Sequence, residues 1–149
     1  MKGKFNIKNY STEVPARKSI AEIENMLALF GAEAIMKEFT SVGTVRMLQF
    51  KYGESVFKLP ANVNGVKEVL YGGRRSYHGR DSMKGREDRA YRVAWRIIKD
   101  WIHAQLSLIA SGQAKPDEIF LSYMFDGKRT LYEAHIEGKL LTGKKETRE

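Results

Sequence analysis

The chain has 149 residues, of which 42% are hydrophobic and 11% aromatic, with only three prolines. That length fits a single domain over residues 1–149, and that composition excludes a chain that is disordered throughout. Twenty-six Lys and Arg against eighteen Asp and Glu give a net charge of +8, which favours polyanionic or phosphorylated partners. Because the chain has no Cys, disulfides, thiolate nucleophiles and thiolate metal ligands are excluded.

Residues 1–71 are predicted to form a strand-rich half. Apolar and polar side chains alternate within residues 5–14, and this alternation predicts a strand. Ser19 and Glu22 have the spacing of a capping box, which predicts the start of a helix with apolar residues at helical spacing. Gly31 stands where such a helix needs a left-handed residue at its end.

Three short β-type segments follow, at residues 32–39, 44–52 and 55–60, and the turn-forming sequences SVG and GE separate them. Because consecutive strands with tight links pair with their neighbours, these segments predict an antiparallel meander. Asn62 is then placed to cap a short helix that carries Val63 and the apolar residues after it.

Residues 86–138 are predicted to form a helical half. One long helix is expected over residues 86–111, and Pro116, followed by two acidic residues, opens a further helix. Residues 130–136 (TLYEAHI) fit either a strand or a short helix. Since the strands are segregated from the helices along the chain, the sequence predicts an α+β fold.

Two basic segments flank the helical half: a glycine-rich loop at residues 72–85 and a tail at residues 139–149. No stretch approaches the roughly 18 to 20 apolar residues that span a bilayer, and the N-terminus lacks the apolar core of a signal peptide. We therefore expect a cytoplasmic protein that does not act at a membrane.

The long helix shows two unequal faces when its residues are placed at about 100° intervals around a wheel. Apolar side chains cover roughly 220°, so most of the helix must be buried by its own domain or by a second copy of the chain. A homo-oligomer is therefore expected. The remaining arc, about 80° wide, carries residues three or four positions apart. This basic stripe consists of Arg89, Arg92, Arg96, Lys99 and His103.

The loop before the helix adds positive charge and aromatic rings to the stripe. Arg guanidinium groups bind phosphate oxygens bidentately, and Tyr rings can stack on bases. The two segments together predict a site for a phosphorylated ligand, either a polymer or a small nucleotide. Its phosphate contacts would come from Arg89, Arg92, Arg96, Lys99, Arg74 and Arg75, and its stacking contacts from Tyr77 and Tyr91.

A simpler interpretation treats the stripe as the solvated edge of a buried helix. Asp88 lies four residues before Arg92, and Asp100 lies four residues after Arg96. Pairs at this spacing are ordinary helix-surface ion pairs, and they would neutralise two of the arginines.

Other chemistries find little support in the sequence. The histidines lack metal-binding spacing, and GxSxG and P-loop motifs are absent, so we expect no catalytic residue, metal or cofactor, and no enzyme. A carboxylate pair for acid–base catalysis would have to come from residues such as Glu24, Glu33 and Glu38. The aromatic residues of the helical half are at a spacing typical of a core rather than of a pocket.

Three segments carry a family resemblance: FKLPANV (57–63), RVAWRIIKDW (92–101) and LYEA (131–134). In these segments the chain resembles a family of small phage and prophage proteins, and the likeness extends over most of the chain outside residues 72–85 and the tail. The resemblance implies an accessory protein in the bacterial cytoplasm. By analogy, it is similar to phage proteins that use arginines and aromatics to sequester nucleotide signals of host defence.

Three functional hypotheses follow, all non-enzymatic. The favoured one is a nucleotide second-messenger sponge that counters host antiviral defence. The second is a nucleic-acid-binding module that uses the same stripe and loop along a phosphate backbone. The third is an inhibitor or adaptor whose basic face meets an acidic surface of a host protein.

Overall fold

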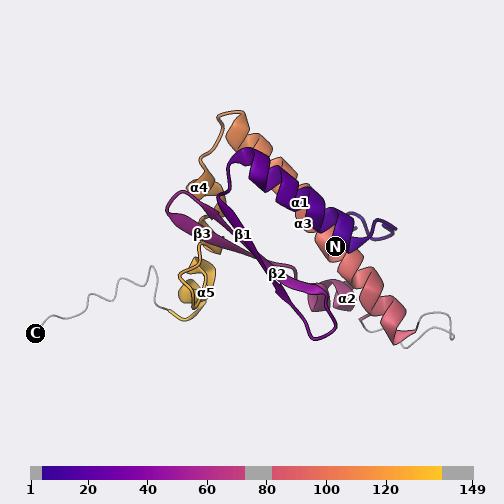
Figure 1. Cartoon of the computed structure of the whole chain (residues 1–149). Coiled ribbons are helices and arrows are strands. Elements are labelled where there is room, and N and C mark those ends of the chain that lie inside the picture. Colours follow the sequence, from indigo (N-terminus) through magenta and orange to yellow (C-terminus); the bar gives the residue numbers. More distant parts are fainter. Residues whose placement is uncertain (1–4, 73–81, 139–149) are drawn as a thin grey trace, which may run out of the picture. The chain divides into compact units, whose positions relative to one another are not determined.

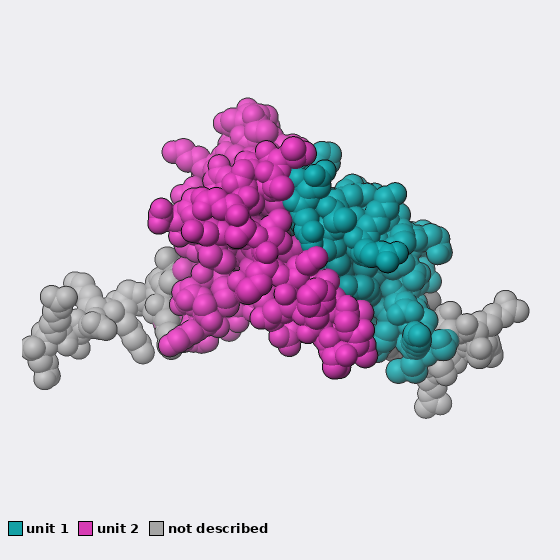
Figure 2. Space-filling view, viewed as in Figure 1, with its two compact units in different colours: residues 1–26, 61–105 teal, residues 27–60, 106–149 magenta. Residues whose placement is uncertain are grey.

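The computed structural model describes residues 5–72 and 82–138 (Figure 1). The elements comprise an antiparallel sheet of three strands and several helices, one of them long, which confirms the α+β class. The chain divides into two compact units (Figure 2). Unit 1 comprises residues 1–26 and 61–105, and unit 2 comprises residues 27–60 and 106–149. Each unit thus combines a segment of the strand-rich half with a segment of the helical half.

The first described segment belongs to unit 1, and it corrects a prediction. Residues 5–14 contain turns and no strand, so the predicted N-terminal strand is wrong. Asn9 has a left-handed backbone, with φ 64°, which interrupts an extended conformation. The carbonyl groups of Tyr10 and Thr12 accept hydrogen bonds from arginine side chains instead of from a neighbouring strand.

Helix α1 (Ala16–Phe30) starts three residues before the predicted capping box. The amides of Lys18 and Ser19 donate to the Pro15 carbonyl, so this proline opens the helix and Ser19 lies inside it. Ser19 is completely buried, and the carboxylate of Glu22 pairs with Arg96 instead. The capping-box prediction is therefore wrong, although the helix itself is confirmed.

The rest of unit 1 is built on α2 (Val63–Tyr71) and α3 (Met83–Ala110). The side chain of Asn62 caps α2, as predicted, and accepts a hydrogen bond of 2.8 Å from the Gly65 amide. Helix α3 starts earlier than the sequence predicted because Ser82 accepts a hydrogen bond from the Gly85 amide at 3.0 Å. Residues 83–85 therefore belong to the helix and not to a loop.

The large apolar side chains of α3 between Tyr91 and Ile109 are buried or half-buried, as the helical wheel predicted. Trp95 and Ile102 have no exposed surface, and on α1 the same holds for Ile23. Within unit 1, α1 and α3 lie side by side, and a salt bridge from Glu22 to Arg96 joins them (Figure 1).

The sheet of unit 2 is the predicted meander, with strand order β1-β2-β3. Its strands are β1 (Ala34–Phe39), β2 (Val45–Tyr52) and β3 (Ser55–Pro60), and both pairings are antiparallel. Gly43 and Gly53 adopt positive φ values of 84° and 59° in the two links, a conformation that favours glycine.

Three short helical segments complete unit 2: α4 (Pro116–Phe120), the 3₁₀ turn η1 (Leu121–Tyr123) and α5 (Leu131–Ile136). Of the two predicted alternatives for residues 130–136, the helix is therefore confirmed. A bridge from Met124 to Phe57 holds this region against β3.

Three phenylalanines form the aromatic part of the unit 2 core. The ring centroid of Phe50 lies 5.3 Å from that of Phe57 and 5.4 Å from that of Phe120, and all three side chains are buried. Spacings of this size are typical of favourable aromatic pairs.

Candidate functional site

The stripe predicted from the helical wheel lies along α3 in unit 1, and its first two arginines contact the N-terminal segment. Arg89 donates from Nε and Nη2 to the Tyr10 carbonyl, at 3.1 and 2.8 Å. Arg92 donates from Nε to the Thr12 carbonyl at 3.3 Å. Both arginines therefore bind neutral oxygen atoms, and no carboxylate of the described residues forms a salt bridge with either of them.

The other two cations of the stripe meet carboxylates. Arg96 forms a salt bridge of 2.9 Å with Glu22 on α1, and Lys99 lies 3.6 Å from the same carboxylate. Lys99 also lies 3.4 Å from Asp100. Because these side chains are only about one-fifth to one-third exposed, the pairs are partly shielded from water.

Asp100 anchors the N-terminal segment. Its carboxylate accepts a hydrogen bond of 2.8 Å from the Asn9 side chain and lies 3.2 Å from the Lys8 ammonium. Partial burial tends to raise the pKa of Asp100, but contacts from Asn9, Lys8 and Lys99 outweigh it and hold the pKa below its usual value of 3.8. Asp100 is therefore ionised at neutral pH.

These contacts divide the stripe into two parts. The charges of Arg96 and Lys99 are compensated by carboxylates, whereas those of Arg89 and Arg92 are not. The helix-surface pairs considered above, Asp88 with Arg92 and Arg96 with Asp100, are not the ones that form among the described residues.

Of the remaining residues predicted to contact a ligand, only Tyr91 lies in the described part of the chain. Arg74, Arg75 and Tyr77 lie outside the described residues, so the phosphate and stacking roles proposed for them stay predictions. Tyr91 is half-buried on α3, within unit 1.

The acidic and histidine side chains of residues 5–72 and 82–138 do not gather into a metal-binding cluster. No group of three or more His, Asp or Glu side chains there could hold a metal ion. Glu33 lies 3.6 Å from Lys51, and Glu38 forms a salt bridge with Arg46, so these carboxylates face cations rather than each other.

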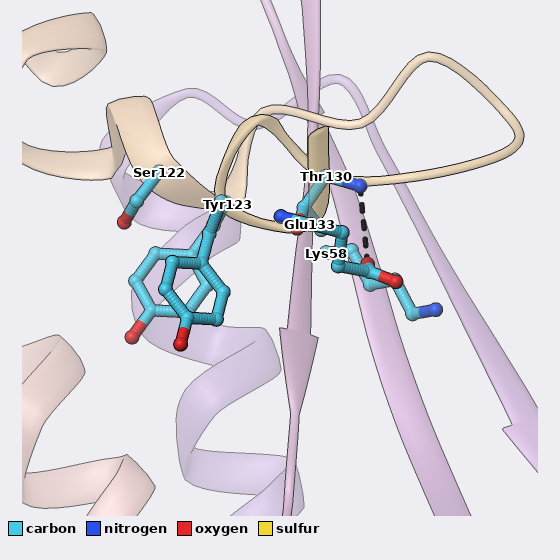
Figure 3. A pocket seen from close by; sticks show the side chains of 6 residues that line it. Lys58, Ser122, Tyr123, Thr130 and Glu133 are labelled. Atoms are coloured by element: carbon cyan, nitrogen blue, oxygen red, sulfur yellow. Dashed lines mark hydrogen bonds between the residues drawn. The ribbon is translucent and has the colours of Figure 1, made fainter. Parts of the chain in front are cut away.

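A second candidate site, which the sequence did not reveal, is a pocket of about 470 Å³ within unit 2 (Figure 3). Its walls come from β3, from η1 and from the start of α5. The lining residues are Lys58, Ser122, Tyr123, Thr130, Tyr132 and Glu133.

Glu133 is held in place in the pocket by a reciprocal pair of hydrogen bonds with Thr130. One of its carboxylate oxygens accepts a hydrogen bond of 3.1 Å from the Thr130 amide, and the Thr130 hydroxyl accepts one of 3.2 Å from the Glu133 amide. This capping box starts α5. The hydrogen bond from the Thr130 backbone is the main reason why the pKa of Glu133 is lowered, with the Lys58 charge contributing.

Lys58, which lies on β3, is the positively charged residue among the described lining of this pocket. Its ammonium lies 5.1 Å from the centre of the Phe125 ring, in the range of a cation–π contact. Figure 3 shows Tyr123 and Ser122 on one side of the pocket, and Glu133 and Lys58 on the other. The capping spacing of Thr130 and Glu133 was visible in the sequence, but nothing in it indicated that β3 would bring Lys58 beside them.

Comparisons of the chain with protein-family models, with curated proteins and with solved structures find no match. Among the helices of the described residues, none has the length and apolarity needed to cross a membrane.

Proposed function

We propose that the protein is a non-enzymatic binder of a phosphate-bearing ligand and that unit 1 attracts this ligand. The uneven distribution of charge carries the proposal. Unit 1 has fifteen Lys and Arg against eight Asp and Glu, a net charge of +7, whereas unit 2 has eleven against ten, a net charge of +1. A positive field concentrated on one part of a protein raises the local concentration of anions and speeds their association.

Arg89 and Arg92 are the proposed phosphate contacts. Arg89 uses Nε and Nη2 for the Tyr10 carbonyl, and Arg92 uses Nε for the Thr12 carbonyl. Since a guanidinium has five N–H donors, each side chain retains donors for a phosphate oxygen. Arg96 and Lys99 instead contribute to the field, because their closest acceptors are carboxylates.

The favoured ligand is a nucleotide messenger of host defence, which the protein would sequester as a phage accessory protein in the bacterial cytoplasm. Arginines together with aromatic residues on and near α3 support this choice, as does the resemblance to phage proteins. Self-association is part of the proposal, and exposed apolar side chains in unit 2 support it. Among these, Leu29 is 81% exposed and Val42 is 82% exposed.

The test uses the full-length protein and two probes, cyclic di-GMP and a single-stranded DNA of about 20 nucleotides. Affinity is measured by calorimetry across a salt series, and native mass spectrometry reports the subunit count. A polymer bound through five or six phosphates should lose orders of magnitude in affinity between about 50 and 200 mM salt, whereas an enclosed dinucleotide should lose much less. The dependence of affinity on salt concentration thus distinguishes a protein that sequesters a small nucleotide from a nucleic-acid-binding module.

A pair of charge-matched variants tests the site itself. Arg89→Gln with Arg92→Gln should weaken binding at least ~10-fold, because two phosphate contacts are lost. Arg17→Gln with Lys18→Gln removes the same charge from exposed positions on α1 of the same unit and should weaken binding far less. Equal losses would mean that the ligand senses only net charge. Binding of neither probe by the natural protein would contradict the proposal.

A further inference from the structure

The pocket of unit 2 has the dimensions of a small-molecule site, and the described residues that line it all belong to that unit. We propose that it binds a neutral, polyhydroxylated ligand, namely one or two sugar rings of a saccharide. This inference goes beyond the proposed function, since it involves neither unit 1 nor a phosphate group.

The charges of the pocket favour a neutral ligand. Among the described residues that line it, Lys58 and Glu133 provide one cation and one carboxylate, so these residues have no net formal charge. The two are close enough that the Lys58 charge helps to lower the pKa of Glu133. For an anionic or a cationic ligand placed here, the attraction of one of these side chains is opposed by the repulsion of the other, so neither charge gains a clear advantage.

The hydrogen-bonding groups of the pocket favour hydroxyl partners. The Glu133 carboxylate accepts a hydrogen bond from the Thr130 amide and is also contacted by the Thr130 side chain, but its two oxygens can accept further hydrogen bonds. The Lys58 ammonium contacts a ring and no carboxylate among the described residues, so it retains N–H donors. Because a hydroxyl group both donates and accepts, the hydroxyls of a sugar can satisfy the acceptor and the donors at once.

Aromatic side chains supply the second requirement of a sugar site, a flat surface for the C–H face of a ring. Tyr123 and Tyr132 both line the pocket, and Tyr132 is 58% exposed. An aromatic ring buries apolar surface on its face while its hydroxyl keeps a polar partner.

The placement of these groups favours a saccharide over a flat base. The polar residues come from separate elements, with Ser122 on η1 lying apart from Glu133 on α5 and Lys58 on β3 (Figure 3). A base displays its donors and acceptors only along its edge, whereas a sugar ring displays hydroxyls around its whole circumference. The pocket therefore fits the distribution of polar groups on a sugar better than that on a base.

The test is a titration of the ¹⁵N-labelled full-length protein with maltose, cellobiose and lactose, followed by NMR. At least one disaccharide should shift the amide signals of residues 122–123 and 130–133 in a saturable manner. Tyr132→Ala should weaken binding about 10-fold or more through the lost ring contact. Glu133→Gln should also weaken it, and this change retains the cap because Gln serves at that position of a capping box.

Matched controls are available for both changes. Tyr10→Ala removes a similarly exposed ring from unit 1, and Glu118→Gln removes an exposed carboxylate of α4 outside the pocket; neither should alter binding. Circular dichroism verifies that each variant is folded. The proposal fails if none of the disaccharides shifts these signals, or if free phenylalanine or GMP binds the pocket and the sugars do not. Neither result bears on anion binding by unit 1, so the two proposals stand or fall separately.

Discussion

Unit 1 and unit 2 differ in the use they make of charged side chains. Unit 1 holds nearly all of the net charge, yet Arg96 and Lys99 are paired with carboxylates inside the unit. Unit 2 is almost neutral, yet Lys58 and Glu133 at its pocket can still form hydrogen bonds, because an ammonium has three donors and a carboxylate accepts several hydrogen bonds. A high charge therefore does not by itself identify a binding surface, because part of it stabilises the fold.

The units also differ in how their cores are held together. The unit 2 core contains the cluster of Phe50, Phe57 and Phe120, which is stabilised by apolar burial and ring contacts and involves no charged group. In unit 1, buried apolar residues such as Trp95 are accompanied by polar contacts that fasten the N-terminal segment to α3. Hydrophobic burial is not weakened by charge screening, whereas contacts between partly exposed charges weaken as the concentration of a salt such as sodium chloride rises.

The largest expected effect comes from the aromatic cluster. Phe57→Ala should lower the free energy of unfolding by about 3 to 5 kcal/mol, because it removes a buried ring and leaves a cavity between Phe50 and Phe120. Urea unfolding followed by circular dichroism measures this loss at low and at high salt. The loss should be the same at both, since no charge is involved.

A control for that change is Val42→Ala, also in unit 2, where the side chain is 82% exposed. It should alter the free energy of unfolding by no more than about 0.5 kcal/mol. If Phe57→Ala were equally mild, the aromatic cluster could not be the main source of stability in unit 2.

An intermediate effect on the free energy of unfolding is expected from breaking an ion pair, and each unit contains a pair that can be compared. Arg96 and Glu22 in unit 1 have side chains that are 21% and 32% exposed, against 67% and 40% for Arg46 and Glu38 in unit 2. Urea unfolding of the single and double Gln variants gives the coupling free energy of each pair. We expect about 1 kcal/mol for the unit 1 pair and about 0.3 kcal/mol for the unit 2 pair. Both couplings should shrink in high salt.

The order of the two couplings is the informative result. A larger coupling in unit 2 would show that solvent screening does not decide the strength of these pairs. It would also weaken the argument that Arg96 serves the fold rather than a ligand.

Local patterns explain what the sequence predicted correctly. The meander follows from short apolar segments joined by tight turns, and the cap of α2 follows from Asn62 lying three residues before Gly65. The burial of Trp95 follows from its place on the apolar arc of the wheel. Each of these features depends on neighbours within a few positions along the chain.

Long-range contacts explain the errors. Residues 5–14 alternate like a strand, but the acceptors for Arg89 and Arg92 lie 79 and 80 positions away, on Tyr10 and Thr12. No local pattern reveals such a bond. The spacing of Glu22 from Ser19 is that of a capping box, but the carboxylate of Glu22 instead pairs with Arg96, which is distant in the sequence. The unit 2 pocket likewise depends on the pairing of β3 with the segment that follows η1.

The smallest expected effect is the release of the N-terminal segment in acid. Because the pKa of Asp100 is lowered in the folded protein, its contribution to stability is complete above the usual value of 3.8 and is lost as the pH falls through the lowered pKa. Protonation weakens the contacts from Lys8 and Asn9, so amide hydrogen exchange around residues 8–12 should accelerate at acidic pH. The α3 amides should stay protected, since Trp95 and Ile102 remain buried.

Asp100→Asn distinguishes this release from general acid unfolding. Asn can still accept a hydrogen bond from Asn9 but cannot attract Lys8, so exchange at residues 8–12 should already be faster at neutral pH and should change little on acidification. Glu118→Gln, which alters an exposed carboxylate of unit 2, should leave the acid response unchanged. If Asp100→Asn retained the full acid response, another group would have to hold the segment. The contacts between the N-terminal segment and α3 would then not depend on the negative charge of Asp100.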